Sequence, residues 1–123
     1  CADQSLLTSY ACDTTSCGRF RTYNRTHCGR CVPCMVRKAA IHRWGLSDTT
    51  RYKFSALSGA GKTSADDPMA VACAVLAAEQ RGIDSFLGAT LAFASDADRP
   101  HYRRVAEQGL AELAALLRRD GVL

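Results

Sequence analysis

The spacing of four cysteines constrains this chain of 123 residues more than any other feature of its sequence. Cys28, Cys31 and Cys34 form two overlapping C-x-x-C steps, and Cys17 precedes the first of them by eleven residues. Such short steps let neighbouring thiolates turn toward a single ion, and soft sulfur ligands favour Zn²⁺. Four thiolates close a tetrahedral shell and leave no position for a substrate. The sequence therefore predicts a structural zinc site.

The fourth ligand of this site is less constrained than the other three. Cys17 is the preferred candidate, and Cys12, five residues earlier, competes with it. His27 is disfavoured because it adjoins Cys28, and adjacent residues rarely point at the same ion. Cys1 is set aside because it lies far from the other cysteines.

Two arginines are expected beside the thiolates. Four thiolates on one Zn²⁺ carry a formal charge of about −2, which nearby cations offset. Arg30 lies between two of the cysteines, and Arg37 follows Cys34 by three residues, one helical turn on. No paired carboxylates or acid–base constellation accompany them, so we assign no catalytic residue.

The composition indicates a globular protein in a reducing compartment. Hydrophobic residues make up 47% of the chain and charged residues 23%, and the seven cysteines are an odd number. An odd count argues against a disulfide framework, so we expect a cytoplasmic protein. No apolar run reaches the roughly 18–20 residues that span a bilayer, and we expect no membrane association. The first residue is Cys1 rather than Met, so we expect a longer parent protein.

The charge of +4 is divided unevenly along the chain. Residues 1–62 contain ten Lys or Arg and three Asp or Glu, whereas residues 63–123 contain six and nine. A basic half of this kind attracts phosphates, nucleotides or nucleic acid. Cations and aromatics interleave between the first two zinc ligands, at Arg19, Arg21, Tyr23 and Arg25. They are candidate nucleotide or nucleic-acid contacts; the alternative is a loop that covers the metal or packs on another domain.

The pattern along the chain predicts a mainly α fold in three parts. Residues 1–46 form the zinc-binding segment and a following helix, 47–66 a loop or linker, and 67–123 a helical unit. Helices are expected over 33–44, 67–81, 85–94 and 99–120, from proline near the start and glycine after the end of three of them. Residues 1–16 are expected to be irregular, and 51–57 is a candidate short strand.

Apolar spacing predicts which helix faces are buried. Val36, Ala40 and Trp44 share one stripe, residues 69–78 are apolar all round, and a face of the last helix carries leucines every three or four residues. Cys73, in the second of these helices, is predicted to be a small core residue. Residues 58–63 invite comparison with a phosphate-binding loop, but Ala56 stands where that pattern needs glycine, so a linker is favoured.

The cysteine segment resembles the C-terminal zinc motif of the 7-cyano-7-deazaguanine synthase family. That motif reads S-C, a spacer, and C-G-x-C-x-x-C-x-x-R, and it matches Ser16-Cys17, the segment 28–34 and Arg37. The match covers about a fifth of the chain. The long continuation past Cys34 is more similar to relatives of these enzymes in bacterial antiphage defence systems.

The resemblance implies that zinc is structural and that the chain is the C-terminal part of an α/β ATP-pyrophosphatase-type enzyme. Such enzymes use ATP and ammonia to convert a deazaguanine carboxylate into a nitrile, and a relative could instead modify a deazaguanine on a macromolecule. The family's S-G-G-x-D-S loop is absent from this sequence. We therefore expect ATP to bind an upstream catalytic domain or a partner from the same operon, with no activity in this chain alone. The alternative is a stand-alone zinc module that binds nucleic acid or protein, and an oligomer is compatible with either.

Overall fold

The computed structural model describes residues 3–59 and 67–123, and these residues form a mainly helical protein. The helices are α1 (Gln4–Tyr10), α2 (Val32–Trp44), α3 (Asp67–Arg81), α4 (Ile83–Leu87) and α5 (Arg99–Arg119), with 3₁₀ turns η1 (Ala11–Asp13) and η2 (Gly88–Leu91). Within the described ranges there is no β-strand, only a single bridge between His27 and Tyr52. The predicted fold class is therefore confirmed at the level of a mainly α protein.

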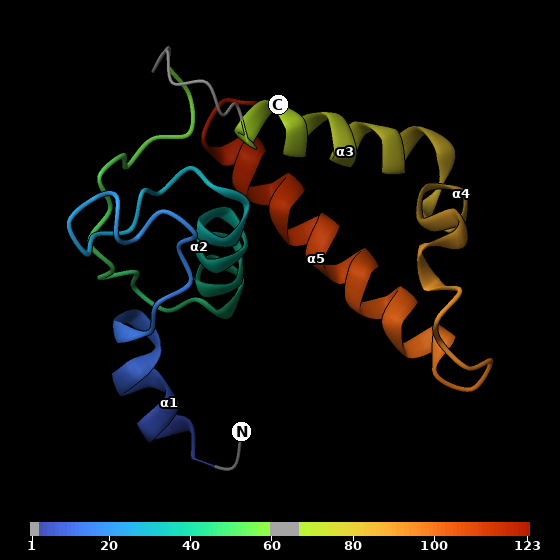
Figure 1. Cartoon of the computed structure of the whole chain (residues 1–123), viewed down its shortest axis with the longest axis horizontal. Helices are drawn as coiled ribbons and strands as arrows, with labels where there is room; N and C mark the ends of the chain where they lie inside the picture. The colour runs from blue at the N-terminus through green and yellow to red at the C-terminus, as the bar shows by residue number, and fades with distance from the viewer. Residues whose placement is uncertain (1–2, 60–66) are drawn as a thin grey trace.

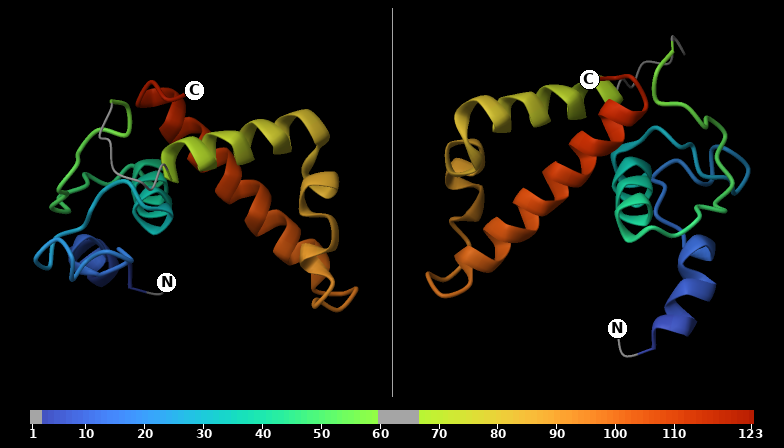
Figure 2. Two further views of the ribbon diagram at one scale, coloured as in Figure 1. Left: turned by 45° about the horizontal axis from the view of Figure 1, so that its top comes forward. Right: turned by 180° about the vertical axis from the view of Figure 1, so that it is seen from behind.

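The long helix α5 organises the molecule. Its C-terminal half packs against α2, and its length is flanked by α3 and α4, so that α3, α4 and α5 outline a triangle beside the cysteine segment (Figure 1). Among the helices, α1 contacts only η1, and it lies apart from α3 and α5 in both views of Figure 2. The main core lies where α2, α3 and α5 meet, and its buried side chains are Met35, Ala39, Leu57, Val71, Ala72, Val75, Ala114, Leu116 and Leu117.

Local chemistry accounts for the ends of α2. Cys31 is its extended N-cap residue, and Pro33 lies in the first turn, where a missing N–H group costs nothing. Gly45 ends the helix in the left-handed conformation, with φ of 77°, and its N–H group reaches the carbonyls of Ile41 and His42. The predicted boundaries of this helix are confirmed to within one residue.

Three local predictions are wrong. Residues 1–16 are not irregular, because α1 forms there with the Asp3 carboxylate accepting a hydrogen bond from Leu6 N–H at 2.8 Å. The candidate strand at 51–57 reduces to the bridge at Tyr52. The helix expected over 85–94 is divided into α4 and η2, since Gly88 takes a φ of 46° between them.

The burial predicted for α2 and α3 is corrected as well. The stripe of Val36, Ala40 and Trp44 is exposed, because α5 packs on the other side of α2. Helix α3 buries only the face that meets α5, which leaves Cys73 exposed and not in the core. On α5 the leucines of the second half pack as predicted, whereas Tyr102 in the first half is exposed.

Some predictions fall outside the described residues. The glycine-rich segment 58–63 and the second half of the predicted linker 47–66 lie largely there. No helix in the part of the chain that the structure describes is both long and apolar enough to cross a bilayer.

Candidate metal centre

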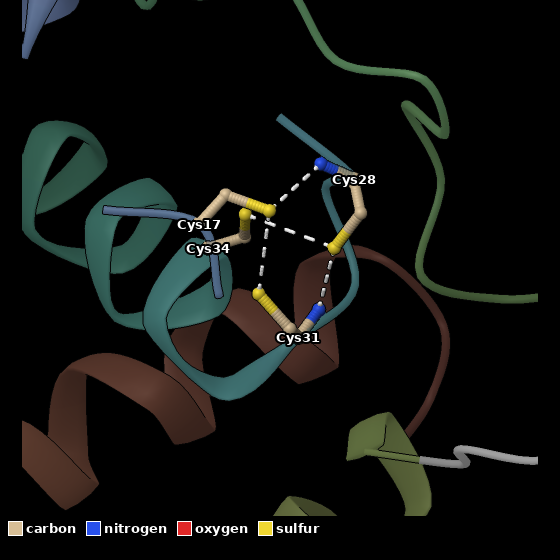
Figure 3. A group of neighbouring side chains, drawn as sticks. All are labelled: Cys17, Cys28, Cys31 and Cys34. Atoms are coloured by element: carbon tan, nitrogen blue, oxygen red, sulfur yellow. Dashed lines mark hydrogen bonds between the residues drawn. The ribbon is translucent and has the colours of Figure 1, made fainter. Parts of the chain in front are cut away.

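The four cysteines of the predicted site lie together and are buried. All four Sγ atoms lie within 4.8 Å of one another. The Sγ atoms of Cys28 and Cys34 are 3.9 Å apart, as are those of Cys17 and Cys31 (Figure 3). A regular tetrahedron with Zn–S bonds of 2.3 Å has sulfur–sulfur edges of about 3.8 Å. The four thiols therefore fit around a tetrahedral metal ion, with two of the sulfur–sulfur distances already close to the required value.

Three separate pieces of chain supply these sulfurs. Cys17 follows η1, Cys28 precedes the turn at Gly29, and Cys34 occupies the first turn of α2 with Cys31 as its cap residue. Gly29 makes the turn possible, because its φ of 86° is a conformation that other residues rarely adopt. An ion at the centre would join the loop before residue 20 to the start of α2.

Backbone N–H groups point at the sulfurs from both loops. Cys17 Sγ accepts from Cys28 N–H at 3.2 Å and from Arg19 N–H at 3.3 Å. Cys28 Sγ accepts from Cys31 N–H at 3.2 Å and from Arg30 N–H at 3.5 Å. These donors favour the thiolate over the thiol and offset part of the negative charge that four thiolates bring.

Burial and these donors act in opposite directions on the thiol pKa values. Burial opposes ionisation of Cys28, but the N–H groups of Arg30 and Cys31 outweigh it and lower the pKa of that thiol. Burial dominates for Cys31 and Cys34, and it raises both pKa values. A cation among the sulfurs would favour ionisation of these buried thiols, as expected of metal ligands.

A shell of rings covers the sulfur cluster. His27 Nδ1 lies 4.0 Å from Cys34 Sγ, and its ring is flanked by Phe20 at 5.3 Å and Tyr52 at 5.9 Å between centroids. Burial, followed by the nearby charge of Arg37, lowers the pKa of His27 and keeps the ring neutral. The rings exclude water from the site, which strengthens metal–thiolate bonding.

Lys38 is the cation of this region that the sequence did not single out. It is buried, its ammonium lies 4.4 Å above the centroid of Tyr52, and it donates to Ser55 O at 2.9 Å. Its attraction to Cys34 is one of the effects that oppose the lowering of its pKa by burial. The sequence could have indicated this lysine, because it follows Cys34 by four residues, about one helical turn.

The guanidinium groups of the two arginines predicted beside the thiolates have other hydrogen-bond partners, although Arg30 N–H donates to Cys28 Sγ. Arg37 donates to Thr14 Oγ1 at 2.7 Å, to Ala11 O at 2.6 Å and to Thr50 Oγ1 at 3.1 Å. Arg30 donates to Gly59 O at 3.2 Å. Arg37 on α2 thus holds both η1 and the segment that follows α2 against this helix. The described contacts of both guanidinium groups are to oxygen atoms and not to cysteine sulfur.

The competing ligand Cys12 lies apart from the cluster. Its Sγ atom is 3.8 Å from Ser47 O and 3.9 Å from Asp48 Oδ1. Among the described residues, the group of side chains able to hold a metal contains Cys17 and not Cys12 or His27. The structure therefore brings together the four cysteines that were preferred from spacing.

The candidate nucleotide-contacting residues lie in a series of turns between Cys17 and Cys28. Arg21 and Arg25 are exposed, whereas Arg19 lies 3.8 Å from Asp67 Oδ2. Tyr23 packs edge-on against Phe54, with centroids 5.9 Å apart. The turn therefore lies beside the segment that follows α2, and only part of it faces solvent.

An apolar groove runs along the outer face of α2. It has a volume of about 520 Å³ and contains the exposed stripe described above, and its walls are Ala11, Ser16, Val32, Pro33, Val36, Arg37, Ala40, Ile41 and Trp44. Val36 is 49% exposed and Trp44 43%. A surface of this kind can accept apolar side chains from a neighbouring protein.

Comparison of the chain with protein-family models, with curated proteins and with solved structures finds no match.

Proposed function

We propose that this chain is a module built around one structural Zn²⁺ and that it is the zinc-bearing part of an ATP-dependent enzyme similar to 7-cyano-7-deazaguanine synthases. The observation that carries the proposal is the buried group of four sulfurs within 4.8 Å, which occupies the S-C and C-G-x-C-x-x-C-x-x-R pattern. The ligands are Cys17, Cys28, Cys31 and Cys34. Fe²⁺ can occupy the same sulfur set, so metal analysis is part of the test.

The role of the ion in this proposal is to fold the chain. The N-terminal half of the described structure has few buried apolar side chains apart from the cysteines and α2, so metal–sulfur bonding supplies much of its stability. A closed Cys₄ shell offers no open coordination position, so we assign the ion no part in bond making.

The catalytic chemistry belongs to an ATP-binding domain that carries the S-G-G-x-D-S loop, either in the same polypeptide or in a partner. We propose the apolar groove on α2 as the surface that receives this domain. Exposed Val36 and Trp44 support the proposal, since apolar side chains of this size on one groove are typical of a covered interface. The substrate is a deazaguanine carboxylate, converted to the free nitrile or, as in the defence-related variant, placed on a macromolecule.

The test uses the native protein isolated with any attached or associated ATP-binding domain. It is incubated with ATP, ammonia and the deazaguanine carboxylate, and products are identified by mass spectrometry. We expect ATP-dependent consumption of the carboxylate and one zinc per copy of this chain. A Val36→Asp variant should keep its zinc but lose ATP-dependent consumption of the carboxylate, because the ATP-binding domain no longer docks on α2.

Two results would contradict the proposal at different points. Zinc-free protein that folds normally would remove the structural role of the metal. A zinc-loaded, intact protein that associates with no ATP-binding domain and leaves the carboxylate unchanged would remove the enzymatic assignment and keep the zinc module.

A further inference from the structure

The basic side chains of the two halves of the molecule have different partners. On the helical tail, four of the six arginines are paired with described acids, namely Arg99, Arg103, Arg118 and Arg119. Around the metal centre, four exposed cations have no ion pair with any described residue, namely Arg21, Arg25, Arg51 and Lys53. Because acids outnumber Lys and Arg in residues 63–123, the net positive charge of the chain lies on the cysteine side.

The fold brings these cations from two loops onto one region. Lys53 N–H donates to His27 O at 2.8 Å and Phe54 N–H to Cys28 O at 3.1 Å. The segment after α2 therefore runs beside the two residues that precede the turn at Gly29, which is called the metal turn below. The packing of Tyr23 on Phe54 places the arginine-bearing turn next to the same segment. Tyr52 turns inward to His27, and its neighbours Arg51 and Lys53 are exposed. The two loops are adjacent on one side of α2 in Figure 1.

The backbone at Arg25 has a conformation that is unusual for arginine, in a turn where its N–H group donates to Phe20 O at 2.9 Å. Asn24 and Arg25 have φ values of 50° and 58°, and Arg25 is exposed. Asparagine tolerates the left-handed region, but a long side chain such as arginine is disfavoured there, and glycine would be accommodated without strain. Strained residues of this kind collect at binding sites, where the side chain serves a ligand and not the fold.

We propose that this basic face, formed by Arg21, Arg25, Arg51 and Lys53 with the aromatic edges of Tyr23 and Phe54, binds a single-stranded nucleic acid. Cations spaced along two loops suit a flexible phosphate backbone, and half-buried aromatic rings beside them offer planes for bases to stack on. No described helix presents these cations for insertion into a duplex groove, because they all lie on loops. The inference goes beyond the proposed enzymatic function and does not depend on it.

The experiment measures fluorescence anisotropy of zinc-loaded full chain with labelled probes. The probes are single strands of RNA and of DNA of about 20 nucleotides, a duplex of the same sequence, and inorganic triphosphate as competitor. Because single strands release about 0.7 counterions per phosphate contact, log Kd should depend linearly on log salt. Tighter binding of RNA than DNA supports additional contacts to the 2′-hydroxyl, and equal binding supports contacts to phosphate and base alone.

The test variant combines Arg25→Gly with Lys53→Gln. It should reduce the salt slope by about 1.4, from two lost phosphate contacts, while the urea midpoint stays unchanged or rises because the left-handed strain is relieved. The matched control, Arg81→Gln with Arg104→Gln, removes the same charge from exposed positions on α3 and α5, and should leave the slope unchanged.

Three outcomes would overturn the inference. They are no binding of single strands at low salt, tighter binding of the duplex than of either single strand, and equal weakening by the test and control variants. Zinc content is measured for every sample. Failure here with one zinc per chain would leave the proposed function intact.

Discussion

Replacing Gly29 by alanine tests how closely the segment after α2 approaches the metal turn. Gly29 has a φ of 86°, and a Cβ atom added there would clash with the carbonyl oxygen of Phe54 and lie 3.2 Å from Tyr52 Cβ. The oxygen cannot easily retreat, because its segment is held by the hydrogen bonds from Lys53 and Phe54 N–H to the carbonyls of His27 and Cys28, directly before Gly29.

The cost of Gly29→Ala has two parts. A left-handed residue with a Cβ costs about 1–2 kcal/mol. Moving the segment away from the added Cβ breaks two backbone hydrogen bonds, which contribute about 1 kcal/mol each. We therefore expect a loss of about 3–4 kcal/mol in the free energy of unfolding.

Gly45 provides the matched control, because its φ is 77° and an added Cβ would meet no atom within 4 Å. Gly45→Ala should therefore cost only the left-handed strain, about 1–2 kcal/mol. Both variants lower the entropy of the unfolded chain by similar amounts, so that effect cancels in the comparison. The difference of about 2 kcal/mol isolates the approach of the Phe54 carbonyl.

Urea unfolding followed by circular dichroism, with zinc in excess, measures both variants. Zinc content after gel filtration separates destabilisation from metal loss. Equal destabilisation by the two substitutions would refute the reasoning, since it would mean that Phe54 does not pack against the metal turn.

Three other perturbations give distinct results. Cys31→Ser should lose the metal and precipitate, whereas Cys12→Ser and Cys73→Ser should keep one zinc per chain by metal analysis; zinc retained in the first would contradict the ligand set. Arg37→Lys should lower the free energy of unfolding by about 2–4 kcal/mol, because a lysine cannot reproduce the three hydrogen bonds of this buried guanidinium group, and an unchanged urea midpoint would contradict their contribution. Lowering the pH from 7 to 5 should release the ion, since protons compete for the thiolates; a zinc indicator dye reports it, and full retention at pH 5 would argue against thiolate ligation.

The helix boundaries that the sequence predicted well are those set by local chemistry. Pro33 and Gly45 bracket α2, and each acts through its own backbone conformation, whatever lies around it. The end of α5 before Gly121 follows the same logic. Helix α1 escaped prediction because its seven residues are short for a helix and none of them is buried.

Burial was predicted less well because apolar spacing identifies residues that share a helix face and not the face that meets the core. Helix α2 has apolar residues on two sides, and the stripe with Val36 and Trp44 had the clearer pattern. The structure packs α5 against Met35 and Ala39 instead. That choice depends on where α5 lies, which is set by contacts between residues far apart in sequence.

At the metal centre, too, positions set by neighbours in sequence were predictable, whereas positions set by distant residues were not. The three cysteines of 28–34 are close because the chain between them is short, so spacing alone predicts them. The position of Cys17, and the exclusion of Cys12, depend on the path of a longer loop. Arg37 shows that spacing alone does not identify hydrogen-bond partners. Its position one turn after Cys34 suggested a contact with sulfur, but its acceptors are Ala11, Thr14 and Thr50.

This difference gives Arg37 and the cysteines separable roles in the same segment. The thiolates set the turn and the start of α2, whereas Arg37 ties η1, and through it α1, to that helix. Ala11 forms part of the wall of the apolar groove, so the shape of the groove depends on the hydrogen bond from Arg37 to Ala11 O. Loss of the metal should therefore unfold the cysteine segment together with the groove. Loss of the Arg37 hydrogen bonds should open the groove and leave the metal bound, because none of the three acceptors belongs to a ligand cysteine.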